Sequence, residues 1–251
     1  MSRRISISDE RTWKLERMKH LQASEAAPAI NRSPWGNPDL IFDYKTGLRI
    51  APDIGSRPSV KYGKDVEKYI RGIVQLDFPD VVISYHQYDI LECTEPGYEF
   101  MGATLDGEIQ GGDRGFGILE IKSGSFRSVY DLKKWDNQIP EQYYIQILHQ
   151  LAVVNEAQYA LVAARLKRDP FKDTDNGLPE IVWRYYRFVR NESLTEDITW
   201  LMGMEKDFWK CVKEGHRPVT SVMADLSDLS GIMNRDETGY EGIGPRGGQL
   251  W

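Results

Sequence analysis

Three side chains on two neighbouring stretches of the sequence could together form a hydrolytic centre. Asp106 lies in one apolar-alternating stretch, and Glu120 and Lys122 lie in the next. A glycine-rich turn at 111–115 separates the stretches, as expected for a β-hairpin. Because Glu120 and Lys122 are two residues apart, a strand directs both side chains to the same face. Two carboxylates and an ammonium group on one side of a sheet would suit a divalent metal ion, an attacking water and a phosphate.

This cluster allows three interpretations. It could be a structural network of ion pairs, because an acid two residues before a lysine is common by chance. It could be a metal-dependent phosphodiesterase site, because oxygen ligands suit Mg²⁺ or Mn²⁺ and the two cysteines are too far apart for a zinc site. In that case the metal would stabilise the charge developing on phosphorus, and Lys122 would orient or deprotonate the water. A pair of glycosidase carboxylates is the third interpretation, but it explains neither the lysine nor the amide-bearing helix that follows.

That helix is expected over residues 141–153, with Pro140 at the position favoured before its first turn. Polar residues spaced by three and four residues are expected to share one of its faces: Gln142, Gln146, His149 and Gln150. Amide groups can donate to phosphate or orient a metal-bound water without adding charge. Hydrogen bonds to neighbouring backbone are the plainer alternative for the same residues.

The elements that must position these groups follow from apolar periodicity. Helices are expected over residues 10–27, near 39–45, over 60–74 and from about 193 to 215, and strands over 81–88, 159–165 and 181–189. Ser193 and Glu196 form a capping-box pattern for the last helix. This order predicts an α/β fold with one central mixed β-sheet flanked by helices. We expect a single domain over residues 1–220 and a flexible C-terminal tail over 221–251.

The segment 123–140 combines basic and aromatic residues. Lys133, Lys134 and Trp135 could track a phosphate backbone and stack on a base, and together with Gln142 and His149 they are candidate DNA contacts. A surface loop would explain the basic and aromatic residues equally well.

Composition narrows the class of protein. Hydrophobic residues make up 41% of the chain and charged residues 28%, which is ordinary for a globular protein. No apolar run approaches the roughly 20 residues that span a bilayer, and no apolar signal segment follows the N-terminus, so a cytoplasmic protein is expected. The formal net charge of −6 counts weakly against a nucleic-acid substrate, because a metal ion can cancel the charge of clustered carboxylates.

Four motifs, in order, resemble one known family. Residues 102–108 and 117–123 look like the core of the PD-(D/E)xK nucleases, a restriction-endonuclease-like fold. Residues 62–67, 139–151 and 13–25 narrow the resemblance to the YqaJ-like viral recombinase group of phage lambda exonuclease type. Leu105 stands where the superfamily pattern has a proline. The resemblance extends from about residue 13 to residue 218.

The resemblance implies a role for each matched position. Asp106 and Glu120 would be metal ligands, together with Glu67 and the backbone carbonyl of Ile121. Lys122 would position the nucleophilic water, with Gln146 nearby as part of the catalytic set. Arg17 and Ser24 would hold the 5′-phosphate of a DNA end, a task that suits a guanidinium and a hydroxyl near a helix end.

The implied reaction is Mg²⁺-dependent 5′-to-3′ digestion of one strand of duplex DNA, leaving a 3′ single-stranded overhang for phage-type recombination. Mn²⁺ could replace Mg²⁺. The expected partners are double-stranded DNA ends, a single-strand annealing protein of the Bet/RecT type and further copies of the chain in a trimeric ring. Such a protein would be encoded by a phage or prophage and would act in the bacterial cytoplasm. An endonuclease of the same superfamily and a non-catalytic DNA-end-binding protein are the alternatives.

Overall fold

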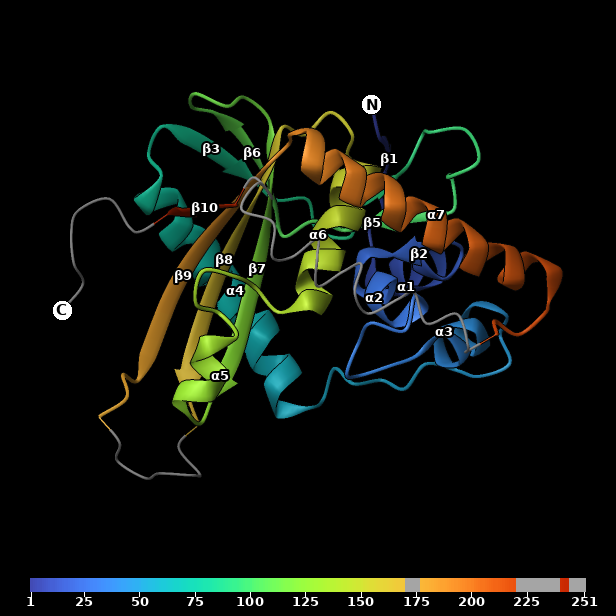
Figure 1. Ribbon diagram of the computed structural model, residues 1–251, viewed down its shortest axis with the longest axis horizontal. Coiled ribbons are helices and arrows are strands. Elements are labelled where there is room, and N and C mark those ends of the chain that lie inside the picture. The colour runs from blue at the N-terminus through green and yellow to red at the C-terminus, as the bar shows by residue number, and fades with distance from the viewer. Residues whose placement is uncertain (170–176, 220–239, 244–251) are drawn as a thin grey trace.

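A six-stranded mixed sheet forms the centre of the computed structural model, which describes residues 1–169, 177–219 and 240–243 (Figure 1). Its strands, in spatial order, are β10 (Tyr240–Ile243), β9 (Ile181–Val189), β8 (Tyr159–Arg168), β7 (Gly117–Phe126), β6 (Gly107–Gly111) and β3 (Val81–Ser84). The β7–β8 pair is parallel, and the other neighbours are antiparallel. The predicted hairpin is present as β6 and β7, with Gly107 opposite Leu119.

Helices cover both faces of this sheet, and the alternation of β7 explains which residues meet each helix. Leu119 and Ile121 pack with Ile70 of α4 (Pro58–Asp77) on one face. Ile118 packs on the other face in the larger core, which contains α6 (Glu141–Val153) and the buried side of α7 (Glu192–Glu214). Glu120 and Lys122 have the same parity as Ile118, so the strand directs them toward α6.

A second sheet lies beside the first, and the sequence did not predict it. It is formed by the short strands β1 (Arg3–Ile5), β4 (Ile90–Glu92), β5 (Met101–Ala103) and β2 (Leu21–Gln22), in that order. The helices α1 (Glu10–Met18), α2 (Ala23–Ala29) and α3 (Pro38–Lys45) belong to the same half of the molecule (Figure 1).

This second sheet corrects two predictions. The single helix expected over 10–27 is two helices, because Leu21 leaves the helical path and its N–H donates to the Phe100 carbonyl at 2.7 Å. The first arm of the hairpin is likewise split between β5 and β6. Asp106 therefore lies in the connection between the two sheets, just before β6, instead of within a strand.

Other expected elements agree more closely. The helices near 39–45, 60–74 and 141–153 are α3, α4 and α6, and the strand at 181–189 is β9. Segment 123–140 contains the end of β7 and the short helix α5 (Val129–Lys133). The capping-box prediction was wrong, because the N-cap of α7 is Asn191, whose side chain accepts from the Leu194 N–H at 2.8 Å. Gly215 ends α7 in the left-handed conformation that glycine favours.

Most of the expected C-terminal tail lies outside the described residues. Within it the structure describes one strand, β10, which pairs antiparallel with β9. None of the helices in the described ranges has the length and apolar character needed to cross a membrane.

Candidate active site

Asp106 is held next to β7 by one main-chain donor and one side-chain donor. Its Oδ2 atom accepts a hydrogen bond from the Ile121 N–H at 2.7 Å, which ties the connection before β6 to the middle of β7. The Asp106 carbonyl accepts from Arg71 Nε at 2.6 Å, and Arg71 also pairs with Glu67 Oε1 at 2.6 Å, one turn earlier on α4. Two of the predicted metal ligands are therefore linked through one arginine.

Glu120 is buried and is surrounded by donors from its own strand and from α6. Its Oε1 accepts from Lys122 Nζ and from Gln146 Nε2, both at 2.7 Å. Lys122 also donates to Gln146 Oε1 at 2.7 Å, so these three side chains form a closed ring. Gln150 Nε2 donates to the other carboxylate oxygen at 2.6 Å. The helix predicted to carry useful amides thus supplies two of them to the predicted carboxylate.

Lys122 is held from a second side by an aromatic ring. Its ammonium lies 4.4 Å from the ring centroid of Tyr143, a cation–π contact. Tyr143 is on α6, one turn before Gln146. The lysine is therefore fixed between a carboxylate, an amide and a ring.

The carboxylates at this site repel one another. Burial raises the pKa of Asp106 well above its ordinary value, and the negative charges of Glu120 and Glu67 raise it further. The pKa of Glu67 is also raised, first by burial and then by Glu120, although Arg71 opposes the shift. Negative charge gathered in a poorly solvated place is stabilised by a bound cation.

The described residues contain no group of three or more His, Cys, Asp and Glu side chains arranged so that they could hold a metal ion. The contacts explain this, because Glu67 is turned to Arg71 and both oxygens of Glu120 already accept hydrogen bonds. The donor chemistry still fits a hard divalent ion, since every predicted ligand offers oxygen. Asp106 and Glu120 are close enough for their charges to interact, and Glu67 and the Ile121 carbonyl would complete the set.

A second predicted site is assembled next to the first. Arg17 donates to the hydroxyls of Ser24 and Thr104, in each case at 3.4 Å, and its guanidinium lies 4.5 Å from the Trp13 ring centroid. Burial lowers the pKa of Arg17, although the charge of Glu25 opposes the shift, and the guanidinium contacts two hydroxyls and a ring. Thr104 is two residues from Asp106, so this basic site adjoins the carboxylates.

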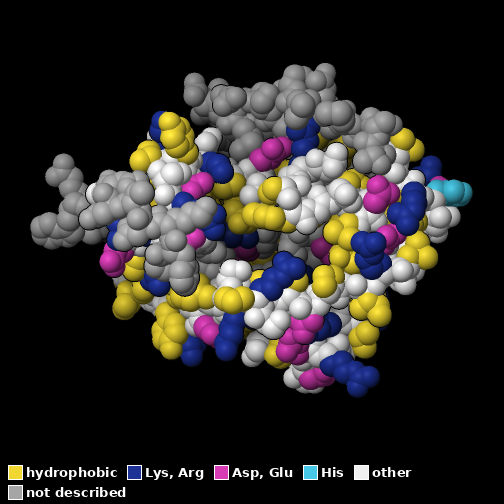
Figure 2. Space-filling view, turned by 90° about the horizontal axis from the view of Figure 1, so that it is seen from below, with side chains coloured by type: hydrophobic (Ala, Val, Ile, Leu, Met, Phe, Trp, Pro, Cys, Tyr) yellow, Lys and Arg dark blue, Asp and Glu magenta, His cyan; other side chains and the backbone are white. Residues whose placement is uncertain are grey.

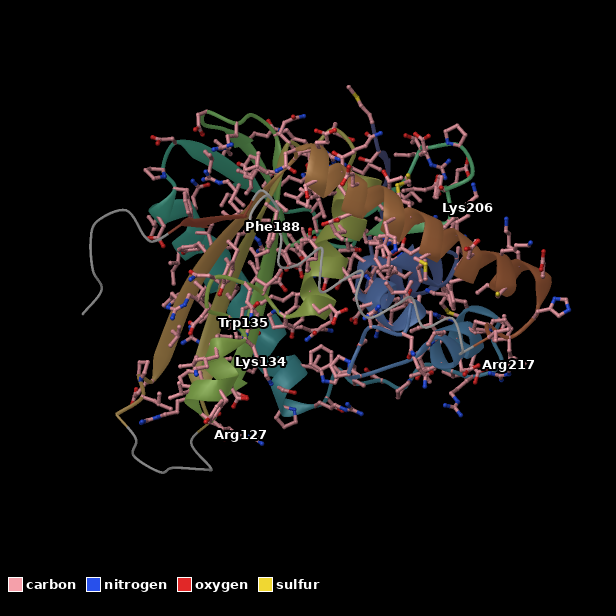
Figure 3. The ribbon with its side chains drawn as sticks, in the orientation of Figure 1. Arg127, Lys134, Trp135, Phe188, Lys206 and Arg217 are labelled. Atoms are coloured by element: carbon pink, nitrogen blue, oxygen red, sulfur yellow. The ribbon has the colours of Figure 1, made fainter. Side chains whose placement is uncertain are left out.

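Two predicted DNA contacts were wrong. His149 is fully buried and points away from the cluster: its Nδ1 faces Glu205 Oε1 of α7 at 2.8 Å, and its Nε2 faces the Gly102 carbonyl at 3.1 Å. Trp135, labelled beside Lys134 in Figure 3, is 9% exposed and packs against Tyr186, which leaves little of its ring for a base. A helical spacing of three and four residues is broad enough to include both a site-facing amide and a core histidine.

The other three candidate contacts are accessible. Lys133 and Lys134 are exposed at the end of α5, and Gln142 is half-buried at the start of α6. Lys134 lies near Asp131 at 3.8 Å. Their contact with DNA stays a prediction.

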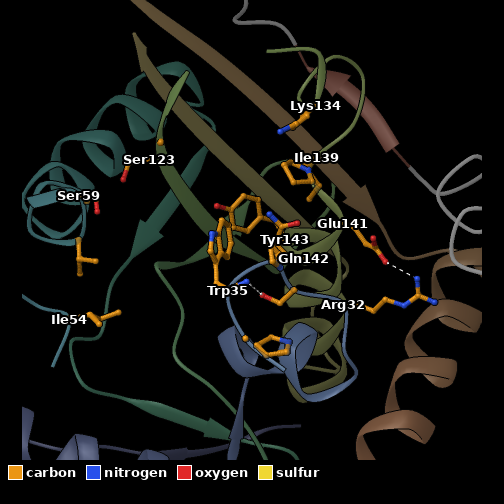
Figure 4. A pocket seen from close by; sticks show the side chains of 18 of the residues that line it. Arg32, Trp35, Ile54, Ser59, Ser123, Lys134, Ile139, Glu141, Gln142 and Tyr143 are labelled. Carbon is orange, nitrogen blue, oxygen red and sulfur yellow. Dashed lines mark hydrogen bonds and ion pairs between the residues drawn. The ribbon is translucent and has the colours of Figure 1, made fainter. Parts of the chain in front are cut away.

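A broad cleft with a volume of about 1690 Å³ opens near Lys122, although the carboxylates and Lys122 itself are not among the described residues that line it. Its walls come from the segment between α2 and α4, the end of β7, and the stretch from α5 to the start of α6 (Figure 4). Ser123 and Tyr143, the immediate neighbours of Lys122 in sequence and in space, belong to its lining. Figure 2 views the molecule from below and shows this face hollowed, with hydrophobic and basic side chains around the hollow.

Sequence reasoning missed two residues of this site, Arg71 and Tyr143. Arg71 follows Glu67 by four residues on one helix, a spacing that favours an ion pair and could have revealed it. Tyr143 lies in the predicted helix over 141–153, and its residue type and spacing predicted no role for it. Its position over Lys122 depends on the packing of α6 against β7, which no local pattern shows.

The comparisons with known proteins agree with this architecture. The uncharacterized protein YqaJ of Bacillus subtilis (strain 168) is 29% identical over 143 residues, which is 57% of this chain and 41% of that protein. This chain thus spans less than half of that relative's length. An alkaline exonuclease from Laribacter hongkongensis (LHK-Exo) superposes with a TM-score of 0.55 and 14% identity, covering 82% of this chain and 95% of that one. The same enzyme in complex with dAMP gives a TM-score of 0.55 at 16% identity and the same coverage.

At these identities the structural likeness establishes the fold, and it confirms the restriction-endonuclease-like core. The family described as YqaJ-like viral recombinase domain matches residues 12–158. That range contains every side chain of the carboxylate cluster and of the Arg17 site. The chain therefore belongs to the YqaJ-like viral recombinase family.

Proposed function

We propose that the protein is a divalent-metal-dependent DNA exonuclease of phage-type recombination. The observation that carries the proposal is the ring of Glu120, Lys122 and Gln146 beside the half-buried Asp106. An ordinary surface ion pair would not need one buried amide, one half-buried amide and a main-chain N–H directed at its carboxylates. The family match and the exonuclease activity of LHK-Exo support the same class of reaction.

In this proposal the described side chains divide the work of phosphodiester hydrolysis. Lys122 holds the attacking water, and Gln146 fixes the lysine through its Oε1 atom. Gln150 keeps the Glu120 carboxylate in one orientation. Asp106 and Glu120 would hold the metal with help from Glu67 and the Ile121 carbonyl, and Mg²⁺ or Mn²⁺ is the expected ion. The metal would supply charge stabilisation at the phosphate.

Arg17 and Ser24 give the proposal its direction. A guanidinium that contacts hydroxyls and a ring is suited to a terminal phosphate dianion, which adds charge-assisted hydrogen bonds. Because this site adjoins Asp106 through Thr104, a 5′-phosphate held there would place the first phosphodiester near the carboxylates. Digestion would then run from 5′ to 3′, releasing 5′-mononucleotides and leaving a 3′ overhang.

The wider setting is carried over from the family resemblance. We propose that the substrate is a double-stranded DNA end, that a single-strand annealing protein of the Bet/RecT type receives the overhang, and that three copies form a ring. Residues 1–220 would form the nuclease domain, acting in the bacterial cytoplasm.

End-labelled linear duplex tests the proposal. Labels at the 5′ or the 3′ end, incubated with Mg²⁺ or with a chelator, report the reaction class, the metal requirement and the direction together. We expect mononucleotides from the 5′ label at the earliest times, and none with chelator. Early release of the 3′ label would contradict the direction, and release in chelator would contradict the metal requirement.

Covalently closed circular duplex separates the two alternatives from the proposal. An exonuclease needs an end and should leave closed circles intact, whereas an endonuclease of the same fold would nick them. Binding to DNA ends without any nucleotide release would identify a non-catalytic end-binding protein.

A further inference from the structure

Trp35 is an exposed tryptophan on the wall of the cleft, in the segment between α2 and α3. Its exposed fraction is 68%, and within the described ranges it is the only tryptophan among the strongly exposed hydrophobic residues. A single exposed hydrophobic residue is ordinary on a protein surface, but this ring lies on the wall of a cleft, where its flat face is available to a ligand. Neither the motifs nor the cluster around Glu120 assigns it a role.

The ring of Trp35 is supported from behind. Its centroid lies 5.9 Å from that of Tyr143, which lies 5.6 Å from Trp135, which lies 6.2 Å from Tyr186 in the core. The main-chain N–H of Trp35 donates to Ser33 Oγ at 3.2 Å, which restrains the loop. Trp35 is therefore the outer member of a row of aromatic rings that is anchored in the sheet.

The same row leads to the reactive centre. The ring of Tyr143 contacts the ring of Trp35, and the Lys122 ammonium lies 4.4 Å from the centroid of the same Tyr143 ring. Figure 4 shows Trp35 and Tyr143 side by side, across the cleft from Ile54 and Ser59. A base stacked on Trp35 would thus be separated only by the Tyr143 ring from Lys122, the residue that we assign to holding the attacking water.

We propose that Trp35 is a stacking platform for a nucleobase of the DNA strand held in the cleft next to the reacting phosphate. This inference rests on the proposed function and names a residue that positions the substrate. Every base has a π face, so stacking on a tryptophan would hold the strand without selecting its sequence, as a nuclease that digests arbitrary DNA requires. Basic side chains for the backbone are present in the same lining, with Arg57 and Lys134 exposed.

The assignment also replaces an earlier expectation. The sequence placed the stacking aromatic at Trp135, which is buried. In the structure Trp135 supports Tyr143, and the accessible face belongs to Trp35 at the other end of the row. The predicted stacking of a base on a tryptophan is retained, but we assign it to Trp35 in place of Trp135.

The test measures DNA binding in chelator, where no cleavage occurs, with a fluorescent end-labelled duplex carrying a short unpaired 5′ segment. We expect Trp35→Ala to weaken binding by about 5- to 150-fold, the range for loss of one base–aromatic stack. Trp35→Phe should restore most of the affinity, because it keeps a π face. Tyr69→Ala is the matched control, since Tyr69 is 62% exposed on α4 outside the cleft lining, and it should bind as the wild type does.

A single abasic nucleotide, moved along the unpaired segment, makes the test specific. One position should weaken the wild type and leave Trp35→Ala unchanged, because the stacking partner is then missing from both. Equal sensitivity of the two proteins at every position would overturn the proposal. So would a Trp35→Ala variant that binds normally but changes its oligomeric mass, which would identify Trp35 as a contact between copies.

The outcomes separate this inference from the proposed function. If one abasic position weakens binding by the wild type but the wild type releases no nucleotides with Mg²⁺, the proposed nuclease function is wrong and the stacking role is kept. A wild type that digests DNA while Trp35→Ala binds and digests equally well would remove the stacking role alone. Absence of DNA binding by the wild type would contradict both.

Discussion

At the scale of single residues, Glu120 is the centre of the site, because its two oxygens accept three side-chain hydrogen bonds. Residue type and spacing predicted the cluster of Asp106, Glu120 and Lys122, and the family resemblance added Gln146. The structure brings these residues together. The sequence could not separate His149 from its neighbours on the helix, because the burial of His149 depends on a carboxylate 56 residues away on α7.

Gln150 provides a test of the hydrogen-bond network. Gln150→Leu removes the donor to Glu120 Oε2 at a fully buried position. Loss of such an outer partner of a metal site costs about 10- to 100-fold in activity or metal affinity. We expect a fall of that size in nucleotide release, measured on linear duplex, with the exposed Gln110→Leu as the control. Unchanged release by Gln150→Leu would show that Glu120 does not need this partner.

Arg17 tests the proposed direction. Arg17→Ala should slow digestion of 5′-phosphorylated ends more than of 5′-hydroxyl ends, because only the phosphorylated end uses the guanidinium. The exposed Arg11→Ala, on the same helix, should slow neither. Equal losses on the two kinds of end, compared as initial rates, would argue against an end-phosphate site at Arg17.

At the scale of elements, the start of α7 shows how a local motif can mislead. The sequence pattern of Ser193 and Glu196 favours a cap at Ser193, but Asn191 carries out the capping. Asn191→Ala should lower the free energy of unfolding by about 1 kcal/mol, the usual cost of losing a cap. Ser193 Oγ has no hydrogen-bond partner among the described residues, so Ser193→Ala should change stability little. Thermal or urea unfolding of the two variants decides between the caps, and a larger loss in Ser193→Ala would favour the sequence pattern.

The contact between α6 and α7 predicts a pH dependence of stability. Burial alone would lower the pKa of His149, but the Glu205 carboxylate outweighs it with help from the Gly102 carbonyl and Glu25, so the net pKa is raised. The folded state then binds more protons than the unfolded state between the ordinary value of about 6.5 and the raised value. Stability from this pair is complete below the ordinary pKa and is lost as pH rises through the raised one.

His149→Gln tests this dependence. Urea unfolding across that pH range should give a decline in the free energy of unfolding for the wild type and a flatter curve for the variant. Parallel curves would show that the pair stays in one protonation state.

At the scale of the whole molecule, the sequence predicted the central sheet except for β10, and it did not predict the second sheet. Long strands such as β8 and β9 carry their own apolar signal. The strands of the second sheet have two or three residues each, and their pairing joins distant segments, such as Arg3 with Glu92. A pattern of two or three residues does not identify a strand. The sequence therefore predicted a helix at residues 20–22 and placed Asp106 within a strand.

The second sheet matters for function because it joins the two sites. β2 leads into α2, which bears Ser24, and β5 leads into Thr104 and Asp106. The parallel pairing of β2 with β5 therefore sets the spacing between the proposed end-phosphate site and the carboxylates. A net charge of −6 is compatible with this arrangement, since acidic groups gather where a cation is expected and basic groups line the cleft.

The most direct test of the central claim is nucleotide release from a linear 5′-phosphorylated duplex by Lys122→Met, with DNA binding measured in parallel. The exposed Lys210→Met on α7 is the matched control. The proposed role predicts that Lys122→Met loses at least about 100-fold in Mg²⁺-dependent release, the lower range for a group that handles a proton, while its affinity for DNA is kept. Release by Lys122→Met at the wild-type rate would contradict the assignment of this cluster as the cutting centre.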